Sequence, residues 1–134
     1  MSRVDAPGFK RALVVDDDAG VQGLFNTLLK RDGFSVDCAP SGREAFEYLR
    51  RSSYSVILLD LMMPDVDGFE LLDRMERDSP SLLRRVIVMT GASHRVVEGL
   101  NSKKVWGMVR KPFDINEMMT SAKKCASGRP PGDA

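Results

Sequence analysis

Four short segments of the chain carry side chains that together could handle a phosphoryl group. Asp16-Asp17-Asp18 follows one apolar run and Asp60 follows another, while Thr90 and Lys111 come after two more. Carboxylates gathered at one spot repel each other and have raised pKa values unless they share a hard cation. Mg²⁺ suits that role, because it binds one or two carboxylates together with water and phosphate oxygens. A hydroxyl and an ammonium beside such a cation indicate a phosphoryl group, and one carboxylate could be its nucleophile.

The elements that must position these residues can be read from the pattern around them. Short apolar runs alternate with stretches of helical period, which is typical of strand–helix units in a parallel sheet covered on both faces. Ligands of such a sheet bind beyond the carboxyl ends of its strands, where the acids, Thr90 and Lys111 are expected to lie. The five expected strands are Ala12–Val15, Ser35–Ala39, Val56–Leu59, Val86–Met89 and Trp106–Val109.

Five helices are expected between and after these strands. The first carries an apolar stripe with helical spacing, formed by Val21, Leu24, Phe25, Leu28 and Leu29. The second begins with Ser41 and Glu44 at the spacing of a capping box. Apolar faces of the later three are Leu71, Leu72 and Met75; Val96, Val97 and Leu100; and Ile115, Met118, Met119 and Ala122.

Length and composition limit the class of protein. A chain of 134 residues with 43% hydrophobic and 29% charged residues is one globular domain. We expect a short N-terminal extension over residues 1–9, a folded domain over 10–126 and a flexible tail over 127–134. The tail is rich in Gly, Pro and small polar residues, which do not pack well.

Charge and apolar run length bear on partners and location. Twenty Lys plus Arg against nineteen Asp plus Glu leave a net charge of +1, so no direct nucleic-acid partner is expected. Basic pairs such as Arg84-Arg85 and Lys103-Lys104 lie on different elements and are interpreted as solvated. No apolar run approaches the ~20 residues that span a bilayer, so we expect no membrane insertion and a cytoplasmic location. Cys38 and Cys125 have no metal-ligand spacing and are expected to be reduced.

Together, the motifs resemble those of the receiver domains of two-component response regulators, over about residues 10–126. Leu13–Asp18 is similar to the family's acidic first turn, and Val56–Gly68 to its phosphoacceptor segment. Met89–Gly91 and Lys111–Phe113 complete the pattern. The resemblance implies a CheY-like, flavodoxin-like α/β fold: a doubly wound five-stranded parallel sheet of order 2-1-3-4-5, with five helices on its two faces.

The same resemblance implies a role for each residue of the acidic edge. Asp60 accepts a phosphoryl group from the phosphohistidine of a histidine kinase or phosphotransferase. Asp16 and Asp17 hold Mg²⁺, together with the Asp60 carboxylate and the backbone carbonyl of Met62. Lys111 pairs with the phosphoryl oxygens.

A switch and several structural positions are also implied. The Thr90 hydroxyl moves to bond a phosphoryl oxygen and repacks the face formed by the fourth helix, fifth strand and fifth helix. The switch position three residues before Lys111 is Met108, where the family usually has Tyr or Phe, so a flexible thioether is expected to fill the space of the usual aromatic ring. Structural roles fall on Pro64, Gly68, Gly91 and Pro112. A cis Lys111–Pro112 bond follows from the resemblance, although the frequency of about 5% for such bonds favours trans from sequence alone.

These roles describe a stand-alone phosphorelay receiver whose output is protein contact, with an unnamed downstream protein and a possible homodimer. It is not expected to be an enzyme beyond self-catalysed phosphoryl transfer and slow autodephosphorylation. Neither Met62 nor Ala92, each two residues after a site residue, can orient an attacking water.

Two alternatives remain open from the sequence. One is a haloacid dehalogenase-like phosphatase, with Asp16 as nucleophile and Asp18 as acid–base, which leaves Asp60–Pro64 without a role. The other is a pseudo-receiver, a non-phosphorylated binding module, which the intact acids, Thr90 and Lys111 argue against.

Overall fold

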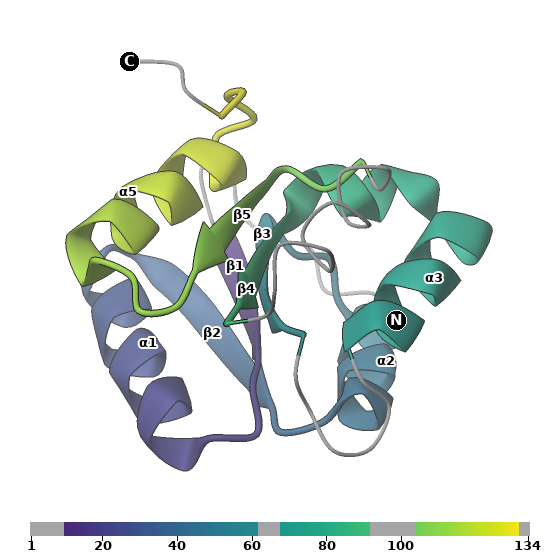
Figure 1. Cartoon of the computed structure of the whole chain (residues 1–134), viewed down its shortest axis with the longest axis horizontal. Helices are drawn as coiled ribbons and strands as arrows, with labels where there is room; N and C mark the ends of the chain where they lie inside the picture. The colour runs from purple at the N-terminus through teal and green to yellow at the C-terminus, as the bar shows by residue number, and fades with distance from the viewer. Residues whose placement is uncertain (1–9, 62–67, 92–103, 132–134) are drawn as a thin grey trace.

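The computed structural model describes residues 10–61, 68–91 and 104–131, which form a three-layer α/β structure (Figure 1). Five strands make one sheet of order β2-β1-β3-β4-β5, and every neighbouring pair is parallel. This confirms the doubly wound order. The strands are β1 (Lys10–Val15), β2 (Phe34–Ala39), β3 (Val56–Asp60), β4 (Val86–Thr90) and β5 (Gly107–Arg110).

Helices cover both faces of the sheet (Figure 1). On one face lie α1 (Ala19–Arg31) and α5 (Ile115–Ala126), and on the other lie α2 (Gly42–Arg51) and α3 (Gly68–Asp78). A short 3₁₀ helix, η1 (Pro80–Arg85), leads into β4. The helix expected around Val96–Leu100 lies outside the described residues. None of the helices in the described ranges is both long and apolar enough to cross a bilayer.

Successive side chains of the central strands point to opposite faces of the sheet and pack into two separate apolar layers. Ala12 and Val14 of β1 pack in the cluster that contains Phe25 of α1 and Met118 of α5. Their neighbours Leu13 and Val15 pack with residues of α2 and α3 on the opposite face. Since both faces of these strands are covered, their sequence reads as a continuous apolar run, not as an alternating one.

Local signals set the helix ends. The Asp18 carboxylate accepts hydrogen bonds from the N–H groups of Gly20 and Val21, at 2.8 and 3.1 Å, and so caps α1. Ser41 Oγ accepts from the Glu44 N–H at 3.2 Å at the start of α2, as expected for half of the capping box. One residue of the predicted apolar stripe is wrong: Leu24 is 49% exposed, because it lies at the edge of the helical face that meets the sheet.

After α5, the described residues 127–131 contact residues at the amino ends of β1 and β5. Of the tail predicted over residues 127–134, the structure describes 127–131. The indole N–H of Trp106 donates to the carbonyl of Arg129 at 2.6 Å, which holds this segment against the residues that precede β5. The hydroxyl of Ser127 accepts a hydrogen bond from Lys10 Nζ at 2.9 Å.

Candidate functional site

The two central strands bring the acids together. Val15 of β1 is the register partner of Leu59 of β3, so the residues that follow, Asp16 and Asp60, are neighbours at one edge of the sheet. Asp16 is fully buried and Asp60 is 4% exposed, while Asp17 beside them is exposed. One carboxylate oxygen from each of the three lies within 4.8 Å of the others.

Lys111 supplies positive charge to this cluster. Its Nζ lies 3.5 Å from Oδ2 of Asp60 and 4.0 Å from Oδ2 of Asp16. The Lys111 N–H donates to the carbonyl of Thr90 at 2.8 Å, and the bond to Pro112 is cis, as the family resemblance implied. The ammonium therefore reaches the acids from the end of β5, two strands away from β3 in the sheet.

Thr90 ends β4 and is fully buried, next to the strand that carries Asp60. Met108 is half-buried in β5, is the register partner of Val88, and packs with the cluster on the α2–α3 side of the sheet. Both residues that the sequence assigns to a switch are thus on adjacent strands. Of the predicted site residues, Met62 and Pro64 lie outside the described part of the chain.

Two glycines were predicted to be structural, and their surroundings differ. A Cβ on Gly68 would lie 2.5 Å from Leu61 Cα and 2.9 Å from the Asp60 carbonyl oxygen, so only glycine fits. The Gly68 N–H also donates to the Leu61 carbonyl at 3.1 Å. A Cβ on the exposed Gly91 would meet only Lys111 Cβ, at 3.9 Å, which is ordinary contact within the described residues.

Burial dominates the electrostatics of Asp16. It raises the pKa of that carboxyl, and the charges of Asp60 and Asp17 add to the rise. The Asp18 N–H, which donates to Asp16 Oδ1 at 2.9 Å, and the Lys111 ammonium act in the opposite direction. Among the described residues, Asp16 Oδ2 is buried and accepts no hydrogen bond.

The donor set fits a hard divalent cation. Three carboxylates provide oxygen ligands within reach of one another, and one of them has a buried oxygen without a hydrogen-bond donor. Mg²⁺ prefers oxygen ligands and keeps several waters, which suits a cluster in which Asp17 is open to solvent. Bringing a positive ion to this point would also relieve the repulsion that raises the pKa of Asp16.

One positioning contact was not predicted from the sequence. The side-chain amide of Gln22 donates a hydrogen bond to the carbonyl of Asp16, which ties α1 to the acidic turn. The Asp16 N–H donates to the carbonyl of Ala39 in β2 at 3.1 Å. The only sequence signal for Gln22 was its place beside the apolar stripe, one helical turn after the acids. Asp18, by contrast, belongs to the helix cap.

Comparison with known sequences places this geometry in context. A family model described as the response regulator receiver domain matches residues 12–123. The chain is similar to sporulation initiation phosphotransferase F of Bacillus subtilis, with 30% identity over 118 residues that make up 86% of this chain and 92% of that protein. It is 32% identical over 113 residues to transcriptional regulatory protein SrrA of Staphylococcus aureus, covering 83% of this chain. The chain spans 45% of the length of SrrA.

The fold of this chain is also similar to that of a solved structure. Response regulator protein TrrA from Thermotoga maritima, determined in complex with Mg(2+)-BeF, has a TM-score of 0.75 and 29% sequence identity to this chain. The match covers 87% of this chain and 99% of that one.

Proposed function

Because the chain belongs to the response regulator receiver family, and is therefore a phosphorelay signalling receiver, we propose that Asp60 is its phosphoacceptor. The observation that carries this assignment is the Asp60 carboxylate at the end of β3, with Lys111 Nζ 3.5 Å away and two further acids beside it. Asp16 is the poorer candidate, because it is fully buried and one of its oxygens already binds the Asp18 N–H.

The proposed reaction uses few protein groups. An Asp60 carboxylate oxygen attacks the phosphorus of a phosphohistidine, an O–P bond forms, and the imidazole leaves with the electrons of the P–N bond. Lys111 pairs with the phosphoryl oxygens and exchanges its present contact with Asp60 for one with the transferred group. Asp16, Asp17, Asp60 and the Met62 carbonyl are proposed to hold Mg²⁺, which when bound supplies positive charge to those oxygens.

We further propose that Thr90 and Met108 couple phosphorylation of Asp60 to a change in the output surface. The Thr90 hydroxyl, buried at the end of β4, gains a new acceptor when a phosphoryl group stands on the neighbouring strand. Thr90 and Met108 belong to adjacent paired strands, so a shift of Thr90 changes the packing of Met108 beside Val88. The output surface is the one that includes β5 and α5, and its partner is a downstream protein.

The donor is proposed to be a histidine kinase or histidine phosphotransferase. The similarity to sporulation initiation phosphotransferase F, which this chain matches over most of both lengths, supports a phosphotransfer partner. Slow self-dephosphorylation, a cytoplasmic location and a possible homodimer stay predictions. The phosphatase alternative loses its acid–base, because the Asp18 carboxylate caps α1.

Intact mass spectrometry after incubation with acetyl phosphate and Mg²⁺ tests the acceptor. The native chain is expected to gain one phosphoryl group, Asp60→Asn none, and the exposed control Asp78→Asn one. EDTA is expected to abolish the gain. An adduct that persists in Asp60→Asn and is lost in Asp16→Asn, with release of phosphate, would overturn the assignment in favour of a phosphatase.

A further inference from the structure

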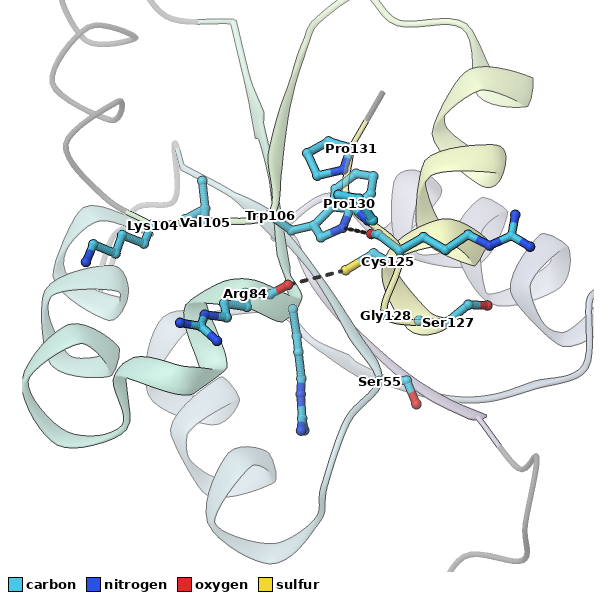
Figure 2. A pocket seen from close by; sticks show the side chains of 13 residues that line it. Ser55, Arg84, Lys104, Val105, Trp106, Cys125, Ser127, Gly128, Pro130 and Pro131 are labelled. Carbon is cyan, nitrogen blue, oxygen red and sulfur yellow. Dashed lines mark hydrogen bonds between the residues drawn. The ribbon is translucent and has the colours of Figure 1, made fainter. Parts of the chain in front are cut away.

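A basic hollow of about 710 Å³, drawn in Figure 2, lies near the amino ends of β4 and β5. The acids lie at the opposite edge of the sheet, after the carboxyl ends of β1 and β3. The hollow forms where η1 enters β4, where Trp106 precedes β5, and where the chain leaves α5. We define the basic hollow by its charged lining, Arg84, Arg85, Lys104 and Arg129, together with Trp106. Its size falls in the range of small-molecule sites, about 300–1,000 Å³.

Four basic residues line the hollow, although the chain as a whole carries a net charge of only +1. The four basic side chains of the lining are accompanied by no Asp or Glu. Arg85 donates to the carbonyl of Tyr54 at 3.0 Å. Over residues 10–61, 68–91 and 104–131, no carboxylate lies at ion-pair distance from Arg84, Lys104 or Arg129, although Glu76 lines an adjoining hollow with Arg84 and Lys104.

Hydrogen bonds hold the walls of the basic hollow in place. The backbone N–H of Trp106 donates to the carbonyls of Leu83 and Val86, at 3.1 and 3.0 Å, and its indole N–H donates to Arg129. Figure 2 shows this last bond and the contact of the Cys125 thiol with the Arg84 carbonyl, 3.9 Å long. Three separate segments are thus joined around the hollow. Its backbone is therefore ordered before a ligand binds, and binding costs little conformational entropy there.

We propose that the basic hollow binds a small phosphorylated molecule. Guanidinium groups present planar, paired donors that match phosphate oxygens, and a lysine adds a compact charge. A ligand that carries two or more phosphate charges can form ion pairs with more than one of these cations, which a single carboxylate cannot. This site is separate from Asp60, because it lies at the amino ends of β4 and β5 and the acids lie at the carboxyl ends of the strands.

The only tryptophan of the chain, Trp106, provides a direct signal. We would titrate the native chain with inorganic pyrophosphate and with ATP, in EDTA, and follow fluorescence excited at the red edge of the indole band. EDTA removes divalent cations that could hold phosphate at the acids. A saturable change is expected with at least one of the two compounds, and Asp60→Asn is expected to give the same curve, which separates this result from the acceptor assignment.

Charge variants locate the binding. The double variant Arg84→Glu and Lys104→Glu is expected to weaken binding at least tenfold, and Arg84→Gln with Lys104→Gln severalfold. The matched control Arg31→Glu with Arg43→Glu, at exposed positions of α1 and α2, is expected to stay within twofold. Circular dichroism checks that all variants fold.

Three results would overturn the proposal. They are the absence of a saturable change with both phosphate compounds, equal binding by the native chain and the two double variants at Arg84 and Lys104, and tetraglutamate binding as tightly as pyrophosphate. The last result would assign the basic hollow to an acidic peptide.

Discussion

Replacing Asp16 by asparagine is expected to make the metal-free chain more stable, although it removes a buried residue of the site. The carboxylate oxygens of Asp16 and Asp60 lie within 4.8 Å. At that separation and an effective dielectric constant of about 20, two unit charges repel by about 3.5 kcal/mol. Asparagine has nearly the same shape and no charge, and its Oδ1 can still accept the Asp18 N–H.

The attraction that is lost with the charge is smaller than this repulsion. Lys111 Nζ lies 4.0 Å from Asp16 Oδ2, which corresponds to about 4 kcal/mol before screening. The Lys111 side chain is 36% exposed, so we discount this figure to about 2 kcal/mol. The variant should therefore gain about 1.5 kcal/mol, or about 5 °C in Tm for a chain of this size.

The stability gained by Asp16→Asn is expected to be larger at neutral pH than at acidic pH. Burial raises the pKa of Asp16, so the folded chain binds this proton more tightly than the unfolded chain does. The stability that Asp16 contributes is complete below its ordinary pKa and is lost as the pH rises through the raised value. The advantage of asparagine is accordingly full at neutral pH and shrinks as the pH is lowered.

Magnesium should remove the advantage of Asp16→Asn, because a tenfold weaker site loses about 1.4 kcal/mol of stabilisation at saturating Mg²⁺, close to the gain of about 1.5 kcal/mol without the ion. Once a site is largely filled, each tenfold rise in free Mg²⁺ adds about 1.4 kcal/mol to the free energy of unfolding of the native chain, or about 5 °C in Tm. With one carboxylate fewer, Asp16→Asn should bind the ion at least tenfold more weakly.

Thermal unfolding in EDTA and over a series of Mg²⁺ concentrations measures both effects. The exposed control Asp78→Asn carries the same change of charge and should follow the native chain within about 0.5 kcal/mol. A less stable Asp16→Asn in EDTA, or an identical magnesium response in the two proteins, would refute the reasoning.

Three further predictions concern the scaffold. Gly68→Ala should cost at least about 2 kcal/mol on chemical denaturation, because its Cβ would lie 2.5 Å from a backbone atom, whereas Gly23→Ala, with nothing within 4 Å, should gain about 0.5–1 kcal/mol. Tyr54→Phe removes a 2.6 Å hydrogen bond from a buried hydroxyl to Asp37, and the free energy of unfolding should fall by about 1.5–3 kcal/mol. Burial raises the pKa of the Cys125 thiol to about 12, so a thiol reagent at pH 8 should label it only when the chain unfolds.

Each of these has a clear contrary result. Equal stability of the two glycine variants would show that the contact at Gly68 relaxes without cost. A loss below about 0.5 kcal/mol in Tyr54→Phe would mean that water replaces the hydroxyl. Labelling of Cys125 at the same rate in native and denaturing conditions would show that the thiol is accessible in the folded chain.

Periodicity and strand ends predicted a parallel α/β sheet and the placement of the acids, Thr90 and Lys111 at one of its edges, whereas the strand order came from the family resemblance. The first two features depend only on which residues follow apolar runs, and parallel strands end at one edge. Prediction of the strand bounds failed at a buried charged residue. Arg11 lies in β1 and is 3% exposed, because its guanidinium contacts Asp37 of β2 at 3.7 Å. An apolar pattern cannot include such a residue, so the predicted strand started two positions late.

Other features depend on contacts between segments far apart in the chain. The need for glycine at 68 is visible only once Leu61 is placed against it. Arg84-Arg85 and Lys104 read as solvated charges on separate elements, yet β4 and β5 start side by side, and the basic residues before them share one hollow. Arg129 joins them through the hydrogen bond to Trp106.

The contact between Gly68 and Leu61 has a consequence for how such a chain can diversify. The hydrogen bond between Gly68 and Leu61, and the absence of a Cβ on Gly68, bring the start of α3 directly against the end of β3. The placement of α3 beside the acceptor strand therefore depends on these two positions. A chain of this kind can vary on the exposed face of α3 while Leu61 and Gly68 stay fixed.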